Sequence, residues 1–169
     1  MSDLTTLPVH VGSHEEFLAH YSELFEYSPW IVERAWLARP FANAGELHAA
    51  FLDVLAAATD DERLALVRAH PELADKVAQA KGLTAASAAE QASAGLTQLS
   101  PEEFQAFHDL NRSYRARFGF PFIICVRLHS VAAILAAMQS RLGRDRATEL
   151  REALTQIGLI VGLRLALIP

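Results

Sequence analysis

Apolar residues recur along this chain at the spacing of an α-helix, and most of these runs begin with a residue that favours a helix start. In the first run Ser13 and Glu16 stand three positions apart, the spacing of a capping box, in which each side chain accepts a hydrogen bond from a free backbone amide. Phe17 and Tyr21 follow four residues apart, so they share one face of the predicted helix. Similar signals predict further helices that begin near Ser28, Asn43, Thr59, Ser87, Ser100, Val131 and Arg146.

The run from Gly119 to Val126 interrupts this pattern with a stretch of almost continuous apolar residues. Such a run is typical of a buried strand, but a single strand has no partner in an otherwise helical chain. We therefore predict an irregular apolar connector at this point. The whole pattern indicates an all-α protein, a single compact domain over residues 1–169 built as a bundle of about eight to nine helices.

Composition narrows the class of protein. With 169 residues, of which 51% are hydrophobic, the chain can bury a globular core, and its net charge of −5 argues against nucleic acid as a partner. Residues 1–7 show no secretory signal and residues 157–169 are too few to span a membrane, so we expect no membrane association. The single cysteine, Cys125, fits a reducing compartment, and we expect a cytoplasmic location.

The first candidate for chemistry is His70, which precedes Pro71 at the end of the fourth predicted helix. Proline disfavours α geometry in the residue before it, so the side chain of His70 would project from a fixed corner. The negative end of the helix dipole would favour the charged imidazolium, a suitable state for a proton donor. The alternative is that His70 only caps the last carbonyl groups of the helix.

The second candidate is the segment from Ser87 to Gln91. Ser87 and Glu90 again have capping-box spacing, and this structural role would account for both residues by itself. A helix N-terminus also presents free amides and the positive end of a dipole, so it can receive an anionic or carbonyl-bearing ligand. In that interpretation Glu90 would orient a polar group of the ligand or tune His70.

Two further features are candidates for ligand binding. The backbone groups from Phe122 to Val126 need partners, which either neighbouring helix ends or a planar polar ligand can supply. Arg164 falls seven residues after Ile157 on an apolar stripe, and a buried arginine needs a carboxylate, from the protein or from a ligand. Since no set of side chains has the spacing of a metal site, we expect neither a metal nor another cofactor.

Four segments, taken in their order along the chain, resemble one known family. They are residues 70–74 (HPELA), 87–91 (SAAEQ), 111–114 (NRSY) and 118–125 (FGFPFIIC). The sequence is similar to the 2-oxo-4-hydroxy-4-carboxy-5-ureidoimidazoline (OHCU) decarboxylases of urate degradation, and the resemblance extends over essentially the whole chain.

The resemblance implies an all-α, cofactor-free, homodimeric carboxy-lyase that converts OHCU, a small ureidoimidazoline, to (S)-allantoin with stereospecific protonation. It implies that His70 is the catalytic acid and that Glu90 assists it, either chemically or by holding the substrate in register. It further implies substrate contacts from Pro71, Ser87, Ala88, Ala89, Gln91, Phe122, Ile123, Ile124, Cys125, Val126 and Arg164.

Two alternatives stay open beside this interpretation. One is an acid/base lyase or hydrolase that acts on another ureido compound, and the other is a non-catalytic helical interaction module. The interaction module predicts that His70, Glu90 and Arg164 are scattered over the fold. An enzyme instead needs them close to the backbone of residues 122–126, because acid/base groups act within hydrogen-bond reach of one substrate.

Overall fold

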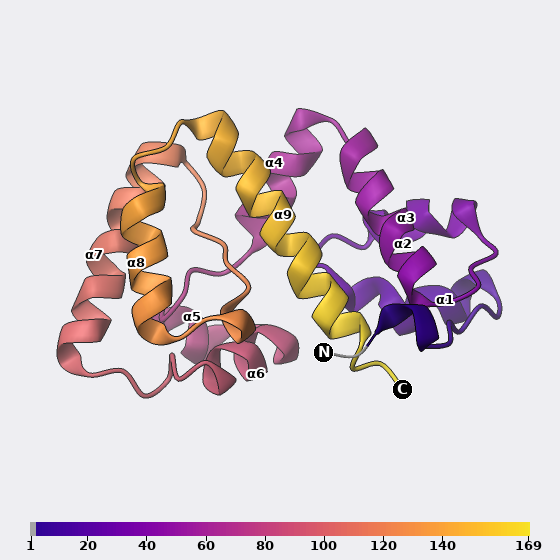
Figure 1. The fold of residues 1–169 in the computed structure, drawn as a ribbon, viewed down its shortest axis with the longest axis horizontal. Helices are drawn as coiled ribbons and strands as arrows, with labels where there is room; N and C mark the ends of the chain where they lie inside the picture. The colour runs from indigo at the N-terminus through magenta and orange to yellow at the C-terminus, as the bar shows by residue number, and fades with distance from the viewer. Residues whose placement is uncertain (1–2) are drawn as a thin grey trace. The chain divides into compact units, whose positions relative to one another are not determined.

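The computed structural model describes residues 3–169, apart from the side chains at positions 77, 78 and 81. Residues 1 and 2 of the N-terminal stretch considered above lie outside this description. The α-helices are α1 (His14–Tyr21), α2 (Trp30–Ala35), α3 (Ala44–Ala57), α4 (Asp60–Ala69), α5 (Lys76–Lys81), α6 (Ala85–Ser93), α7 (Pro101–Phe118), α8 (Val131–Arg141) and α9 (Arg146–Leu165) (Figure 1). The 3-10 helices are η1 (Leu4–Thr6), η2 (Ser22–Leu24), η3 (Trp36–Ala38) and η4 (Val126–Leu128).

The predicted all-α class is confirmed, since none of the described residues lies in a β-strand. Ser13 and Glu16 form the complete capping box that their spacing predicts, and so do Ser100 and Glu103 at the start of α7. Gly119 ends α7 with a φ of 77°, a left-handed conformation that glycine adopts without steric cost. No helix in the described part of the chain is both long and apolar enough to cross a membrane.

One predicted helix cap is wrong. The helix expected to begin near Ser87 begins at Ala85, and its cap is Thr84, whose hydroxyl accepts from the backbone amide of Ser87. Ser87 therefore lies inside the first turn, and the capping-box spacing between Ser87 and Glu90 does not describe a cap. Both side chains are instead buried, which leaves their polar groups facing the interior of the protein.

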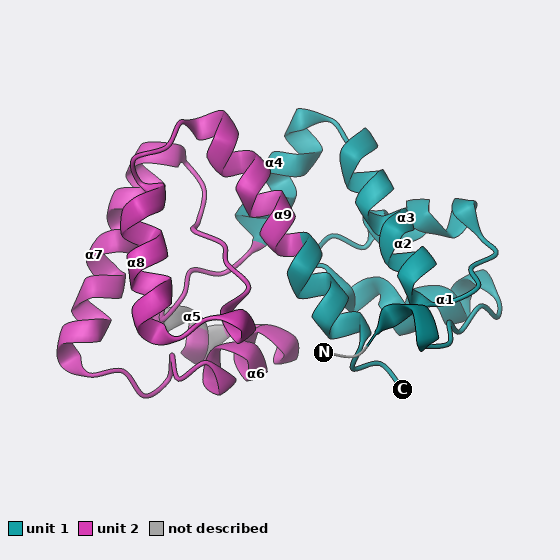
Figure 2. Ribbon diagram, viewed as in Figure 1, with its two compact units in different colours: residues 1–69, 158–169 teal, residues 70–157 magenta. Residues whose placement is uncertain are grey.

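The chain divides into two compact units (Figure 2). The first consists of residues 1–69 and 158–169, and the second of residues 70–157. In the first unit α2 and η1 both pack on α3, and the ring of Phe25 meets that of Phe51 edge-on at 5.4 Å between centroids. The single domain over residues 1–169 stays a prediction.

The core of the second unit is aromatic. Helices α7 and α8 lie side by side, and the connector runs as an open coil from the end of one to the start of the other (Figure 1). Tyr114 on α7 contacts the rings of Phe118 at 4.6 Å and Phe122 at 5.3 Å, and Phe120 stacks on Phe118 at 6.0 Å. The apolar connector is thus part of the core, because its phenylalanines complete an aromatic cluster begun on α7.

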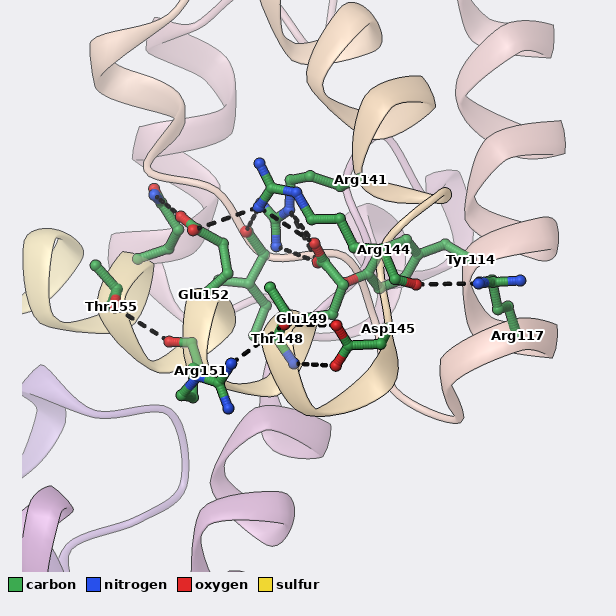
Figure 3. A network of polar contacts seen from close by, with 12 residues as sticks. Tyr114, Arg117, Arg141, Arg144, Asp145, Thr148, Glu149, Arg151, Glu152 and Thr155 are labelled. Carbon is green, nitrogen blue, oxygen red and sulfur yellow. Dashed lines mark hydrogen bonds and ion pairs between the residues drawn. The ribbon is translucent and has the colours of Figure 1, made fainter.

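A buried polar cluster joins this aromatic core (Figure 3). The Glu149 carboxylate on α9 is completely buried, and the Arg141 guanidinium on α8 forms an ion pair with it at 2.8 Å. The hydroxyl of Tyr114 donates to the same carboxylate. Burial, followed by this hydrogen bond, raises the pKa of Tyr114 above its usual value. The cluster therefore links α7, α8 and α9 through one carboxylate.

This linkage predicts a large stability loss for Glu149→Ala. Removal of the carboxylate leaves the Arg141 guanidinium buried without its counter-ion, which costs about 3–5 kcal/mol in the free energy of unfolding. Glu152→Ala is the matched control on the same helix, because Glu152 and both of its partners, Arg144 and Gln156, are at least partly exposed, and the expected loss is below about 1 kcal/mol. Urea unfolding followed by circular dichroism measures both, and equal losses would contradict the special role of Glu149.

Candidate functional site

The loop of residues 70–75 carries the first candidate, His70. Helix α4 ends at Ala69, so the predicted helix boundary immediately before His70 and Pro71 is confirmed. The side chain of His70 is only 7% exposed, and Pro71 is half-buried. The histidine therefore occupies an enclosed position at the start of a loop, where its orientation depends on how that loop is held.

Two buried amide side chains hold this loop. The Gln91 carbonyl oxygen on α6 accepts from the Ala74 backbone amide at 3.1 Å, and the Asn111 side-chain amide on α7 donates to the Leu73 carbonyl at 2.8 Å. Ala74 has a φ of 57°, a left-handed conformation that a non-glycine residue adopts only at some energetic cost. Both hydrogen bonds reach the same peptide group, which consists of the Leu73 carbonyl and the Ala74 amide. They stabilise this turn, and with it the loop that begins at His70.

Helix α6 contributes the second candidate segment. Ser87, Glu90 and Gln91 are buried, and their spacing of three and four residues places them on one face of the helix. Ala88 and Ala89 lie on the other face, where their side chains are exposed. Substrate contacts from these two alanines stay a prediction, and the structure gives their side chains no enclosed surface on which to make them.

The same helix also meets the end of the connector. Helix α6 packs against η4, which begins at Val126. Because Gln91 on α6 also bonds to the loop of residues 70–75, the three segments identified in the sequence are linked through one helix. All three belong to the second unit. That His70, Glu90 and Arg164 converge on one site, as an enzyme would need, stays a prediction.

Arg164 belongs to the first unit, and its partner there is a protein carboxylate. Its guanidinium donates to the carboxylate of Glu26 at 3.0 Å and to the Leu24 carbonyl at 3.1 Å. Glu26 is 1% exposed and Arg164 is 7% exposed, so this is a buried ion pair. Of the two partners that the sequence left open, the structure thus provides the carboxylate of the protein. A contact between Arg164 and substrate stays a prediction.

The connector presents its backbone, because its side chains are enclosed in the core. Phe122 lies beneath the Arg141 guanidinium, whose central carbon is 4.3 Å from the ring centroid. Cys125 is a buried free thiol. Ile123, Ile124 and Val126 are buried as well. A ligand at this segment would therefore meet mainly N–H and C=O groups.

Hydrogen bonds satisfy only one part of this backbone. The Ile123 carbonyl accepts from Arg141 Nη1 at 2.8 Å, and the Cys125 amide donates to Gln156 Oε1 at 3.0 Å. Among the residues that the structure describes, no hydrogen bond reaches the backbone of Phe122 or of Ile124, which are 1% and 6% exposed. Buried backbone groups of this kind normally have a partner, which here a ligand or water can be.

Sequence reasoning assigned no role to several polar residues that support these segments, namely Asn111, Arg141, Glu149 and Gln156. Arg141 follows the buried Ile134 and Met138 at helical spacing, so the stripe argument that singled out Arg164 would also have found it. The Asn111 amide oxygen is buried and has no hydrogen-bond partner among the described residues. No cluster of His, Cys, Asp and Glu within the described ranges could hold a metal ion.

Comparison with known proteins places this chain among similar sequences and folds. The family model described as OHCU decarboxylase matches residues 12–166. A relative from Haloferax volcanii, named 2-oxo-4-hydroxy-4-carboxy-5-ureidoimidazoline decarboxylase, is 40% identical over 166 residues, which cover 98% of this chain and 96% of that protein.

Two solved structures have a similar fold. One is titled (S)-allantoin synthase and matches with a TM-score of 0.70 and 25% identity, over 92% of this chain and 50% of that chain. The other is an OHCU decarboxylase in the presence of (S)-allantoin, with a TM-score of 0.67 and 20% identity, over 91% of this chain and 96% of that chain. At 20% identity the second likeness concerns the fold alone.

The bond between Gln91 and Ala74 predicts a local effect of Gln91→Leu. Loss of the acceptor leaves the Ala74 amide unpaired, which costs about 1–3 kcal/mol in the free energy of unfolding. Gln98→Leu is the control, since Gln98 is exposed and its side chain makes no bond within the described structure. Urea unfolding and amide hydrogen exchange of residues 70–75 measure the effect, and unchanged exchange would show that Gln91 does not hold this loop.

Proposed function

Because this chain belongs to the OHCU decarboxylase family, we propose that it removes CO₂ from OHCU and forms (S)-allantoin in urate degradation, without a cofactor. The structural observation that supports this function most directly is the hydrogen bond between Gln91 and Ala74. It joins the loop that begins at His70 to the buried polar face of α6. An acid and its substrate-orienting neighbours thus come from linked segments, as a cofactor-free decarboxylase requires.

The chemistry follows from the substrate itself. One ring carbon of OHCU carries both a hydroxyl and a carboxylate, and the neighbouring carbon carries the ureido group. When the bond to the carboxylate breaks, CO₂ leaves and its bonding electrons pass into the adjacent C=N bond of the ring, whose nitrogen takes up a proton. The resulting enol must then take up a proton at the ureido-bearing carbon and lose its hydroxyl proton. The net reaction consumes one proton, and the face on which that proton arrives fixes the configuration of allantoin.

His70 is the group that we assign to this proton transfer. His70 is buried and follows the end of α4, and hydrogen bonds to Leu73 and Ala74 fix the loop that it begins. A fixed imidazole can deliver its proton to one face of a planar intermediate and not to the other. General acid catalysis of this kind contributes typically about 10²–10⁴ in rate.

Polar groups on the α6 face are assigned to hold the substrate. Ser87 and Glu90 are buried on that face, and a carboxylate can accept hydrogen bonds from the two N–H groups of a ureido substituent. The Gln91 amide oxygen is occupied by Ala74, whereas its nitrogen has no partner among the described residues and can donate to a substrate carbonyl. Glu90 would act on the reaction either directly or by fixing the substrate beside His70.

Backbone groups of the connector complete the proposed site. The N–H and C=O of Ile124, which have no partner in the part of the chain that the structure describes, can bind an amide-like edge of the substrate, and a backbone N–H can also stabilise negative charge as it develops on the ring. Stabilisation of this charge by fixed dipoles lowers the barrier to CO₂ loss without a metal. The enclosed side chains of the connector also exclude water from that edge.

The proposed assembly is a homodimer in the cytoplasm, and sedimentation can test the assembly. The purified protein has a chain mass of 18.5 kDa, so a sedimenting species of twice that mass is the expected result. Analytical ultracentrifugation over a range of concentrations measures it. A species of single-chain mass at every concentration would contradict the dimer and leave the proposed reaction unaffected.

The proposed function predicts loss of activity in His70→Ala. OHCU is generated freshly from urate with uricase and hydroxyisourate hydrolase, and circular dichroism follows the allantoin formed. The wild-type protein should give (S)-allantoin rapidly, and His70→Ala should lower the rate by about 10²–10⁴ because the acid is lost.

His108→Ala is the matched control for this variant. His108 is exposed on α7 in the same unit, and its ring nitrogen accepts from Arg112 at 2.9 Å. It should keep wild-type activity. Racemic product formed by the wild type at the rate of the blank would overturn the proposed reaction. Normal activity of folded His70→Ala would overturn the role of His70 alone.

A further inference from the structure

The connector is held from one edge by two side chains that come from different helices. Arg141, at the end of α8, donates to the Ile123 carbonyl, and Gln156, on α9, accepts from the Cys125 amide. The Ile123 carbonyl and the Cys125 amide belong to the two peptide groups that flank Ile124, and in a trans peptide the C=O and the N–H point in opposite directions. The opposite edge then carries the N–H and C=O of Ile124, for which the described structure contains no partner.

These two bonds act on the same peptide groups that Ile124 uses. The Ile123 carbonyl shares its peptide bond with the Ile124 N–H, and the Cys125 amide shares its peptide bond with the Ile124 C=O. A donor on the first carbonyl makes the Ile124 N–H a stronger donor, and an acceptor on the second amide makes the Ile124 C=O a stronger acceptor, because hydrogen bonds polarise one another along a chain. The bonds from Arg141 and Gln156 therefore make the backbone N–H of Ile124 a stronger donor and its C=O a stronger acceptor.

Each of the two side chains is itself fixed. Arg141 Nε donates to Glu149 at 2.9 Å (Figure 3). The guanidinium of Arg141 also lies over the ring of Phe122. Gln156 Nε2 donates to the Glu152 carboxylate at 2.8 Å, one turn earlier on α9. A side chain with both ends bonded loses little further freedom when it holds a third group, so its contact with the connector is rigid.

We propose that Arg141 and Gln156 are positioning residues for the decarboxylation proposed above, on which this inference rests. They hold the peptide groups on both sides of Ile124 so that its N–H and C=O together bind one amide edge of the ureidoimidazoline, a donor and an acceptor side by side. Neither side chain has to touch the substrate. They act through the backbone of Ile124, which contacts the substrate. A displacement of this backbone by about 1 Å can lower the rate by about 10²-fold.

Gln156→Leu tests this inference, with Gln105→Leu as its matched control. Gln105 also bonds a carboxylate one turn away, Asp109 at 2.9 Å, but it is exposed on α7 and makes no contact with the connector. We expect Gln156→Leu to lower kcat/KM for OHCU by about 10–100-fold and to speed amide exchange in residues 120–126 by about tenfold. Gln105→Leu should change neither quantity.

Two further variants separate positioning from general stability. The double variant Gln156→Glu with Glu152→Gln exchanges the donor and the acceptor of this pair and keeps an acceptor for the Cys125 amide, so it should recover most of the activity that Gln156→Leu loses. Arg141→Lys keeps a positive charge beside Glu149 but loses the planar fork that also reaches Ile123, so it should lower kcat/KM while remaining folded. The unfolding midpoint is measured for every variant.

The outcomes distinguish this inference from the function on which it rests. An inactive wild-type protein overturns the proposed reaction, and this inference with it. With an active wild type, the inference alone is overturned if Gln156→Leu keeps full activity, or if its exchange in residues 120–126 is unchanged. It is equally overturned if the double variant Gln156→Glu with Glu152→Gln is as impaired as Gln156→Leu, since a retained acceptor would then make no difference.

Discussion

The buried carboxylate of Glu149 is the constraint on which the second unit depends. A charged group that is buried away from solvent must be paired and hydrogen-bonded. The Glu149 carboxylate on α9 is paired with Arg141 from α8 and accepts a hydrogen bond from Tyr114 on α7. Replacement of such a cluster by apolar residues often leaves stability unchanged, so its value lies more in specifying one arrangement than in net free energy. Here the specified arrangement includes the connector, because the guanidinium that pairs with Glu149 also holds the Ile123 carbonyl.

Most of the helical framework could be predicted because its signals are local. A capping box such as that of Ser13 and Glu16 needs only four residues, and a stripe needs two turns of helix. The same spacing misled at Ser87 and Glu90, where Thr84 proved to be the cap. The same three-residue spacing occurs in a capping box and between two side chains on one buried face of a helix. Only the neighbouring elements decide which of the two applies.

The candidate site could be predicted in part. The resemblance pointed to the segments around His70, Ser87 and Phe122, and the structure links these segments through α6. The sequence could not show that the Gln91 side-chain oxygen accepts from the Ala74 amide, because this hydrogen bond joins residues that are 17 positions apart. Gln156 was out of reach for a different reason, since a half-buried glutamine on a helix has no distinguishing pattern in the sequence.

When backbone groups bind a ligand, the residues that fix the geometry of the site can lie far from it in the sequence. Every amino acid except proline offers the same N–H and C=O, so the side chains of residues 122–126 can serve the core while their peptide groups face a ligand. Such a surface needs a fixed shape, and a lone extended segment has no sheet to provide one. Arg141 and Gln156 take the place of neighbouring strands, with one donor and one acceptor on alternate residues. The geometry of a backbone site is therefore encoded in the helices that follow it.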